Sequence, residues 1–309
     1  MRNLTLRQLR YFDALVRHLH FGRAAEACAV SQPALSVQIR ELETSLGVDL
    51  VERSARRVRL TRSGDLLARR VRDILRSVDE LGDIAQAARD GLAGPLRIGV
   101  IPTIAPYLLP GIICELTHLH PGLDIRVRET LTPNLIEELE EGRLDAAIVA
   151  LPLAESTLTE VELFSEEFVL VRPAEDAGKP APDSEKLREM RLLLLEEGHC
   201  FRNQALSFCN MHSTPREMLE GSSLSTLVQM VGAGIGVTLI PEMAMAVEIG
   251  SASVSIARFE DPKPSRRIGM IWRKTSPLAR QYHEISEIVR RQASIQRARR
   301  DPVARRRSA

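Results

Sequence analysis

The sequence predicts an α/β protein in three parts: an N-terminal winged helix-turn-helix, a long linker helix and a two-lobed α/β domain. Three observations support this. A basic N-terminal segment carries a capped helix with a polar outer face, apolar residues then recur at helical spacing, and strands alternate with helices along the rest of the chain. We expect domain boundaries at 1–62, 63–93 and 94–295, with lobe I formed by 94–164 and 268–295, lobe II by 165–267, and a disordered basic tail at 296–309.

The 309 residues carry a net charge of +1 that is unevenly distributed. Residues 1–62 hold eleven Arg against six Asp and Glu, and the last twenty residues hold eight Arg against one Asp, so the middle of the chain is acidic. This segregation favours nucleic-acid binding by the basic head. No apolar run approaches the ~18 residues of a membrane span, no signal peptide is visible, and no Cys or His spacing indicates a metal site or a cofactor. We therefore expect a protein of the reducing cytoplasm with no membrane partner.

The head is predicted to contain helices at about 5–17 and 21–28, followed by a third between Ser31 and Gly47. Ser31 is a typical N-cap, Pro33 is tolerated in the first turn, and Gly47 ends the helix. The alternating runs 50–53 and 58–61 then predict two short strands around an arginine-rich tip, which makes a wing. The alternative is a helical bundle with a solvated polar face.

Six blocks of the head, in order, resemble the LysR-type transcriptional regulators: Leu9–Phe12, Phe21–Ala25, Ser31–Ser36, Ile39–Glu43, Leu46–Gly47 and Thr61–Gly64. In that family the winged head binds double-stranded DNA as a dimer, with its last helix in the major groove. The resemblance implies DNA contacts from the third helix and the wing, at Gln32, Pro33, Ser36, Gln38, Arg40, Arg53, Arg56 and Arg57.

Apolar residues recur with a period of 3.5 to 3.6 from about 63 to 90, and glycines close the run. A helix of this length is typical of helices that pair with a second copy of themselves. The alternative is a helix packed on its own chain. The resemblance favours a dimerising linker, and the family implies a tetramer.

The acidic body begins as a β-α-β-α-β run, with strands at 96–101, 123–129 and 145–150, which predicts a parallel sheet. A second unit follows, with strands expected at 168–171, 192–195 and 235–241 and helices at 184–190 and 224–232, before the chain returns through 268–272 and a helix at 277–292. Two such lobes resemble the periplasmic binding proteins, as expected for a LysR-type effector domain. The glycine-rich segment 231–241 matches that family and lacks the pattern of a phosphate-binding P-loop.

The segments 198–205 and 208–209, together with 101–110, resemble the peroxide-sensing OxyR branch of the family. That resemblance implies that hydrogen peroxide oxidises Cys200 to a sulfenic acid, which Cys209 converts to a reversible disulfide. It also implies supporting roles for Thr103, Thr132, His199 and Arg266, with Arg267 as the alternative to Arg266. Asn203 stands where this branch often carries Asp.

Cys200 and Cys209 lie nine positions apart. If the segment is helical, about 13 Å separates their Cα atoms, whereas a disulfide needs roughly 7 Å or less. Forming the bond would therefore require unwinding, which is how a switch would work. The alternative is that both cysteines are buried hydrophobic residues, as we expect for Cys28 and Cys114.

These observations favour a homo-oligomeric DNA-binding regulator that senses hydrogen peroxide and activates antioxidant genes. By resemblance, its partners would include RNA polymerase and a thioredoxin- or glutaredoxin-type reductant. The closest rival is a LysR-type regulator that binds a small organic anion between the lobes, with incidental cysteines. A third possibility, a thiol peroxidase, is disfavoured by the winged head, so we do not expect an enzyme.

Overall fold

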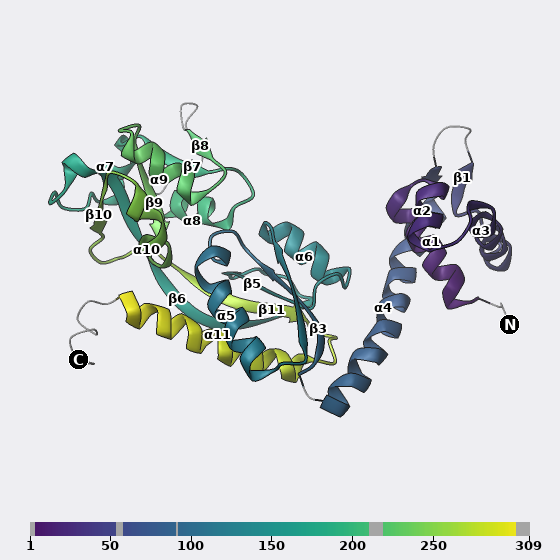
Figure 1. The fold of residues 1–309 in the computed structure, drawn as a ribbon. Helices are drawn as coiled ribbons and strands as arrows, with labels where there is room; N and C mark the ends of the chain where they lie inside the picture. The colour runs from purple at the N-terminus through teal and green to yellow at the C-terminus, as the bar shows by residue number, and fades with distance from the viewer. Residues whose placement is uncertain (1–3, 54–57, 91, 210–218, 301–309) are drawn as a thin grey trace. The chain divides into compact units, whose positions relative to one another are not determined.

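The computed structural model describes residues 4–53, 58–90, 92–209 and 219–300 (Figure 1). The chain divides into two compact units, residues 1–85 and 86–309, and each is considered by itself. Among the described helices, none combines the length and hydrophobicity that a membrane span requires.

The first unit is a winged helix-turn-helix, which confirms the fold expected for the head. Its elements are α1 (Leu6–His18), α2 (Phe21–Ala27), α3 (Gln32–Leu46), β1 (Val51–Arg53), β2 (Val58–Leu60) and α4 (Arg62–Asp90). Thr5 starts α1 in a capping box with Gln8, and the Ser31 hydroxyl accepts a hydrogen bond from the Ala34 N–H at the start of α3. Gly47 ends α3 with φ 74°, a conformation that favours glycine.

The wing is fixed to the helices by a buried carboxylate and a close backbone approach. Oε1 of Glu43 accepts hydrogen bonds from the backbone N–H groups of Leu50 at 2.9 Å and Val51 at 3.3 Å. A Cβ atom at Gly64 would lie 2.1 Å from the Leu50 carbonyl oxygen, so only glycine lets the start of α4 pack this closely against the wing. The wing base is therefore rigidly attached to α3 and α4.

α4 is one continuous helix of 29 residues, as the periodicity predicts. Ala68 and Val71 on one face join the core of the head. Leu66, Ile74 and Leu81 are 62, 46 and 64% exposed on another face. These large apolar side chains leave a stripe of the helix available for a partner.

The second unit is built on a mixed sheet with strand order β4-β3-β5-β11-β6-β9-β7-β8. Lobe I contains β3, β4 and β5, which are parallel, flanked by α5 and α6. Its elements are β3 (Gly94–Val100), α5 (Ala105–Leu119), β4 (Leu123–Glu129), α6 (Thr132–Glu140) and β5 (Ala146–Leu151). The helix α11 (Ala279–Arg300) packs beside α5 and against β6 (Leu158–Pro173) (Figure 1).

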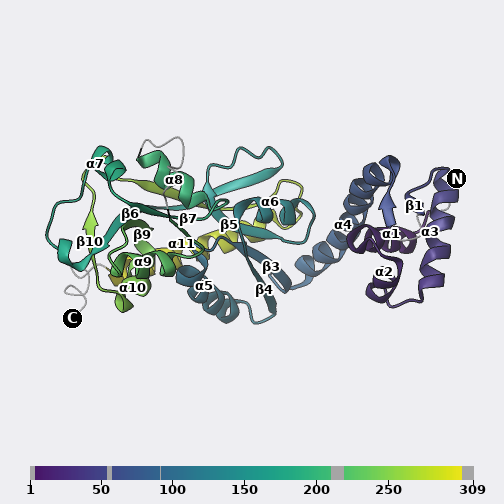
Figure 2. The same ribbon diagram turned by 90° about the horizontal axis from the view of Figure 1, so that it is seen from above.

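Lobe II gathers the strands and helices between 174 and 258 (Figure 2). They are η1 (Ala174–Asp176), α7 (Ser184–Glu189), β7 (Leu192–Leu195), α8 (Cys200–Phe208), β8 (Glu220–Gly221), α9 (Leu224–Gly232), β9 (Val237–Pro241), η2 (Glu242–Ala244), α10 (Met245–Glu248), η3 (Ile249–Ser251) and β10 (Val254–Arg258). The two lobes share β6, which pairs with β11 (Ser265–Arg273) along its first part and with β9 and β10 along its second.

The strand expected at 168–171 is confirmed but is longer than expected. It belongs to the 16-residue β6, whose first half alternates charged and apolar residues because one side of it faces solvent. The expectation of a disordered tail was wrong for residues 296–300, since α11 continues to Arg300 and the Gln296 side chain donates a hydrogen bond to the Tyr107 carbonyl of α5. Residues 301–309 lie outside the described residues.

Candidate redox site and nucleic-acid interface

Cys200 is the first residue of α8, with His199 as its N-cap, and the thiol is partly exposed. Gly198 turns the chain into the helix with φ 95°. A Cβ at this position would lie 2.8 Å from Cδ1 of Leu131, so the turn lies directly against the start of α6. The first turn of a helix favours negative charge, because its N–H groups have no intrahelical partner. The fold therefore places the Cys200 side chain in the first turn of α8, beside these N–H groups.

Cys209 lies at the other end of α8, as its C-cap, and is completely buried. Burial raises the pKa of its thiol to about 11, although Arg188 opposes the shift. The nine residues of α8 form a regular helix, so its rise of about 1.5 Å per residue holds the two cysteines about 13 Å apart. Both thiols are free, and a bond between them requires α8 to unwind.

A buried arginine, Arg266, lies at the centre of the polar contacts near α8. Its Nη1 donates to the Thr103 hydroxyl at 2.7 Å, and its Nη2 donates to the Thr103 carbonyl at 3.1 Å. Its guanidinium also forms an ion pair with the buried Glu166 at 2.6 Å. The Arg266 side chain is 0% exposed, so these partners satisfy a charge that water does not reach.

The connection between Arg266 and the cysteine helix is the ring of Phe201, the residue after Cys200. The guanidinium carbon lies 5.4 Å from the centre of that ring, within the range of a cation–π contact. The opposite lobe contributes Thr132, the first residue of α6, whose buried hydroxyl has no hydrogen-bond partner among the described residues. Buried hydroxyls are normally paired, so this unpaired one is an exception.

The structure thus brings Thr103 and Arg266 into contact and connects Arg266 to α8 through Phe201. Arg267, the alternative to Arg266, lies exposed and forms an ion pair with Glu162 at 3.2 Å instead. Burial lowers the pKa of His199, with a smaller opposing effect of Glu196, so the imidazole is neutral at pH 7. A neutral ring provides hydrogen bonding but no positive charge for a thiolate.

Sequence reasoning missed two buried charged residues that hold this site together. Arg202 on α8 donates to the Leu195 carbonyl at 2.8 Å and pairs with Glu220 at 2.7 Å, which attaches the cysteine helix to the lobe II strands. The second is Glu166, the buried partner of Arg266. Its only signal in the sequence is its spacing of two residues from Phe164 and Phe168, which places it on an apolar face of a strand.

The other two cysteines were both expected in the core. Cys28 ends α2 and is half-buried, but Cys114 on α5 is exposed, so that expectation was wrong for Cys114. The apolar run around Cys114 wrongly indicated a buried position, because α5 buries only one face and position 114 lies outside that face. Asn203 on α8 is also exposed.

The candidate DNA-binding residues of α3 lie on its outer side. Gln32, Pro33 and Arg40 are exposed, whereas Ser36 and Gln38 are half-buried, and Gln38 donates to Glu41 at 2.7 Å. Arg56 and Arg57 lie outside the described residues, and Arg53 ends β1. Sequence reasoning missed Val37, which is 50% exposed on this helix. An exposed apolar side chain there suits contact with a thymine methyl group.

No group of three or more His, Cys, Asp or Glu side chains in the described part of the chain could hold a metal ion.

Two family models match the chain. Residues 6–65 match the bacterial regulatory helix-turn-helix protein of the lysR family, and residues 89–294 match the LysR substrate binding domain. Among curated proteins, the chain is 43% identical over 294 residues to the probable hydrogen peroxide-inducible genes activator of Streptomyces viridosporus, covering 94% of each chain. It is 40% identical to the DNA-binding transcriptional dual regulator OxyR of Escherichia coli strain K12, covering 93% of this chain and 95% of that protein.

Solved structures agree with these matches. A full-length OxyR from Pseudomonas aeruginosa with a cysteine-to-aspartate change superposes with a TM-score of 0.75 at 38% identity, covering 93% of this chain and 95% of that one. A hydrogen-peroxide-bound cysteine-to-serine variant of Corynebacterium glutamicum OxyR gives a TM-score of 0.64 at 34% identity, covering 94% and 95%. These relatives are transcription regulators and not enzymes. The chain belongs to the OxyR branch of the LysR family of transcriptional regulators.

Proposed function

We propose that this protein is a DNA-binding activator that senses hydrogen peroxide through a reversible Cys200–Cys209 disulfide and induces antioxidant genes. The observation that carries the proposal is the placement of the two thiols at opposite ends of one regular helix. They cannot join while α8 is intact, so oxidation and a change of fold are coupled.

The reaction has two steps. The Cys200 thiolate attacks one oxygen of hydrogen peroxide, the O–O bond breaks, and the other oxygen leaves as hydroxide, which is then protonated to water. The resulting sulfenic acid loses its oxygen as a second water when the Cys209 thiol condenses with it to the disulfide. The two thiols together lose two electrons, which a thioredoxin- or glutaredoxin-type reductant returns.

The buried groups beside α8 support the first step. Thr103 accepts a hydrogen bond from Arg266, so the hydrogen of its own hydroxyl can be donated to peroxide or to the sulfur. The unpaired hydroxyl of Thr132, which is in lobe I like Thr103, supplies a second donor. Donors of this kind stabilise the negative charge that develops on the departing oxygen.

The burial of Cys209 supports the order of the steps. Its raised pKa keeps it a thiol inside the folded lobe, and a thiol is a poor nucleophile. Unwinding of α8 both allows the two sulfurs to approach each other and exposes Cys209, so condensation follows local unfolding. The loss of α8 also removes Phe201 from the Arg266 guanidinium, which transmits the change to β11, the strand of Arg266, and to its neighbour β6.

The head would bind promoter DNA through α3 and the wing, and the protein would assemble through α4. The exposed stripe of Leu66, Ile74 and Leu81 fits a second copy of the same helix, and a tetramer would follow from contacts of the body. RNA polymerase would be the partner at the promoter.

The test is to treat the reduced protein with one equivalent of hydrogen peroxide and map disulfides by peptide mass spectrometry over seconds. We expect a Cys200–Cys209 bond in the wild type and none in Cys200→Ser, with Cys114→Ser as a control that behaves like the wild type. In Cys209→Ser, oxidation should stop at the sulfenic acid of Cys200. Slow or absent oxidation of Cys200 would favour a regulator that binds an organic anion between the lobes.

A further inference from the structure

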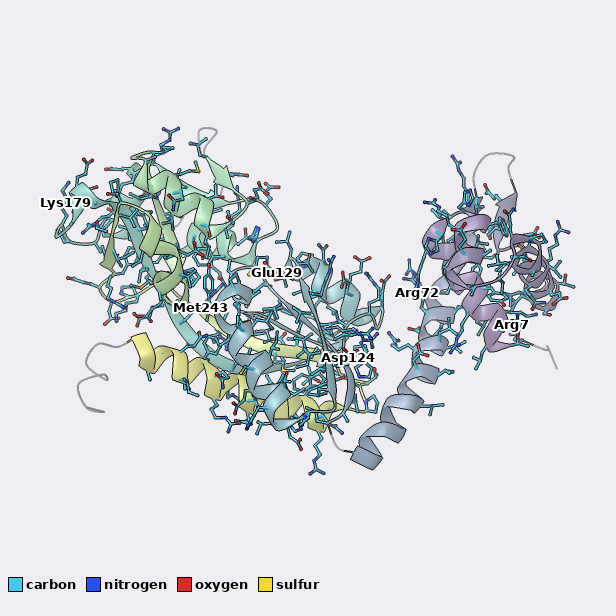
Figure 3. The ribbon with its side chains drawn as sticks, in the orientation of Figure 1. Arg7, Arg72, Asp124, Glu129, Lys179 and Met243 are labelled. Carbon is cyan, nitrogen blue, oxygen red and sulfur yellow. The ribbon has the colours of Figure 1, made fainter. Side chains whose placement is uncertain are left out.

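The buried carboxylate of Glu166 belongs to the redox site through two separate contacts. Glu166 and Arg266 are directly opposite each other in the β6–β11 ladder, so their side chains share one face of the sheet. Oε1 of Glu166 accepts hydrogen bonds from Nε of Arg266 at 2.8 Å and from its Nη2 at 2.6 Å. Oε2 accepts from the backbone N–H of Met243 at 3.4 Å. Met243, labelled in Figure 3, follows β9 in lobe II.

The carboxylate fixes the orientation of the arginine. A guanidinium with a fully buried side chain needs a nearby negative charge, and Glu166 is the acidic residue that pairs with it. Because one Glu166 oxygen binds both Nε and Nη2, the plane of the guanidinium is set and its Nη1 is directed to Thr103. The guanidinium carbon of Arg266 lies over the ring of Phe201.

We propose that Glu166 is a positioning residue for the reaction of Cys200 with peroxide. It acts through Arg266, which orients the Thr103 hydroxyl and holds Phe201 at the first turn of α8. This inference rests on the proposed peroxide-sensing function and adds a residue to it. Glu166 itself does not touch the sulfur or the peroxide.

The variant Glu166→Gln distinguishes a positioning role of the carboxylate from a role in which the side chain only fills space. Glutamine has nearly the same shape but only one acceptor oxygen, whereas Glu166 uses two, one for Arg266 and one for the Met243 N–H. In Glu166→Gln the single oxygen can therefore accept from Arg266 or from the Met243 N–H, and the NH₂ group faces the other donor. The arginine loses its counter-charge in either arrangement, and it also loses its fixed orientation when the NH₂ group faces it.

The experiment measures two reactions of Cys200 in each variant, both followed on the Cys200 peptide by mass spectrometry in the Cys209→Ser background. Oxidation by hydrogen peroxide requires donors for the departing oxygen. Alkylation by iodoacetamide requires only an accessible thiolate. The matched control is Glu167→Gln, which changes the neighbouring strand residue, a partly exposed partner of Lys263.

We expect Glu166→Gln to slow the peroxide reaction about 10-fold or more, since small misplacements of reacting groups have effects of this size. The rate of alkylation should stay within about twofold of the parent rate. A merely structural defect would not produce this difference between the two reactions. Glu166→Asp keeps the charge but is one methylene shorter, so its peroxide rate should fall between the two. Glu167→Gln should behave like the parent.

A peroxide rate in Glu166→Gln equal to that of the parent would overturn the inference, as would an equal loss in both reactions. If Glu166→Gln does not fold, Glu166→Asp decides, because an unchanged peroxide rate in that variant would overturn the positioning role. If Cys200 in the otherwise unchanged protein reacts with peroxide no faster than free cysteine, the sensing function itself fails and this inference fails with it. A fast parent and an equally fast Glu166→Gln would overturn only the inference.

Discussion

The hydroxyl of Tyr107 on α5 donates a hydrogen bond to Oε1 of Glu248 on α10 at 2.6 Å, across 141 positions of sequence. Both side chains are buried, and the other oxygen of Glu248 accepts from the Ser225 hydroxyl on α9, also at 2.6 Å. Burial and the contact with Glu248 raise the pKa of Tyr107, so its proton stays on the hydroxyl at physiological pH. One carboxylate therefore joins lobe I to lobe II.

Tyr107→Phe should destabilise the effector domain by about 1–3 kcal/mol, because it leaves a buried carboxylate oxygen without its donor. The measurement is the free energy of unfolding in urea. Ser225→Ala is the matched control, since it removes the second donor and leaves the first in place. A double-mutant cycle should give a non-additive result. A loss below about 0.5 kcal/mol in Tyr107→Phe would contradict the role of this bond.

Thr132→Val tests the unpaired hydroxyl at the start of α6. Valine has nearly the same shape, and the lost hydroxyl has no partner among the described residues, so stability should be unchanged or slightly raised. The rate of Cys200 oxidation by peroxide should nevertheless fall about 10-fold or more. Stopped-flow kinetics and thermal unfolding measure the two properties. An unchanged oxidation rate would remove Thr132 from the site.

Stability should depend on pH through Cys209. Its pKa is raised from an ordinary 9.0 to about 11 in the folded protein, so the unfolded thiol ionises first as the pH rises. The stabilisation is fully present below about pH 9 and falls by about 2–3 kcal/mol as the pH rises through 11. We expect reduced Cys209→Ser to lose less stability than the wild type across this interval in urea titrations. Parallel curves for the two proteins would rule out the shift.

Arg56→Ala with Arg57→Ala should weaken DNA binding at all sequences and flatten its dependence on salt. Contacts at the tip of a wing go mainly to phosphates, and each one lost lowers the slope of log K against log salt by about 0.9. Fluorescence anisotropy over a range of salt concentrations gives this slope. Arg126→Ala, on the exposed strand β4 beside Asp124 (Figure 3), is the control that removes a positive charge outside the head. A slope that does not change would count against the wing assignment.

The sequence was sufficient for elements that local chemistry determines. Ser31 and Gly47 mark the ends of α3 because a cap and a left-handed residue act within one turn, and the apolar run 192–195 forms a buried strand. Contacts between residues far apart in the chain could not be predicted from the sequence. Thr103 and Arg266 meet across 163 positions, and the pairing of Arg266 with Glu166 depends on a strand register that only the folded sheet defines. The sequence left Arg266 and Arg267 as alternatives for the same reason, since neighbouring strand residues point to opposite faces of the sheet.

Because β6 belongs to both lobes, a movement of one lobe relative to the other must bend or twist this hydrogen-bonded strand. The ladder between β6 and β11 changes register at Ile268 and Gly269, and irregularities of this kind are where a sheet bends most easily. Arg266 lies two residues before that point. If oxidation melts α8 as proposed, this irregular part of the ladder would let the change at Cys200 reach the other lobe as a small twist of β6 and β11.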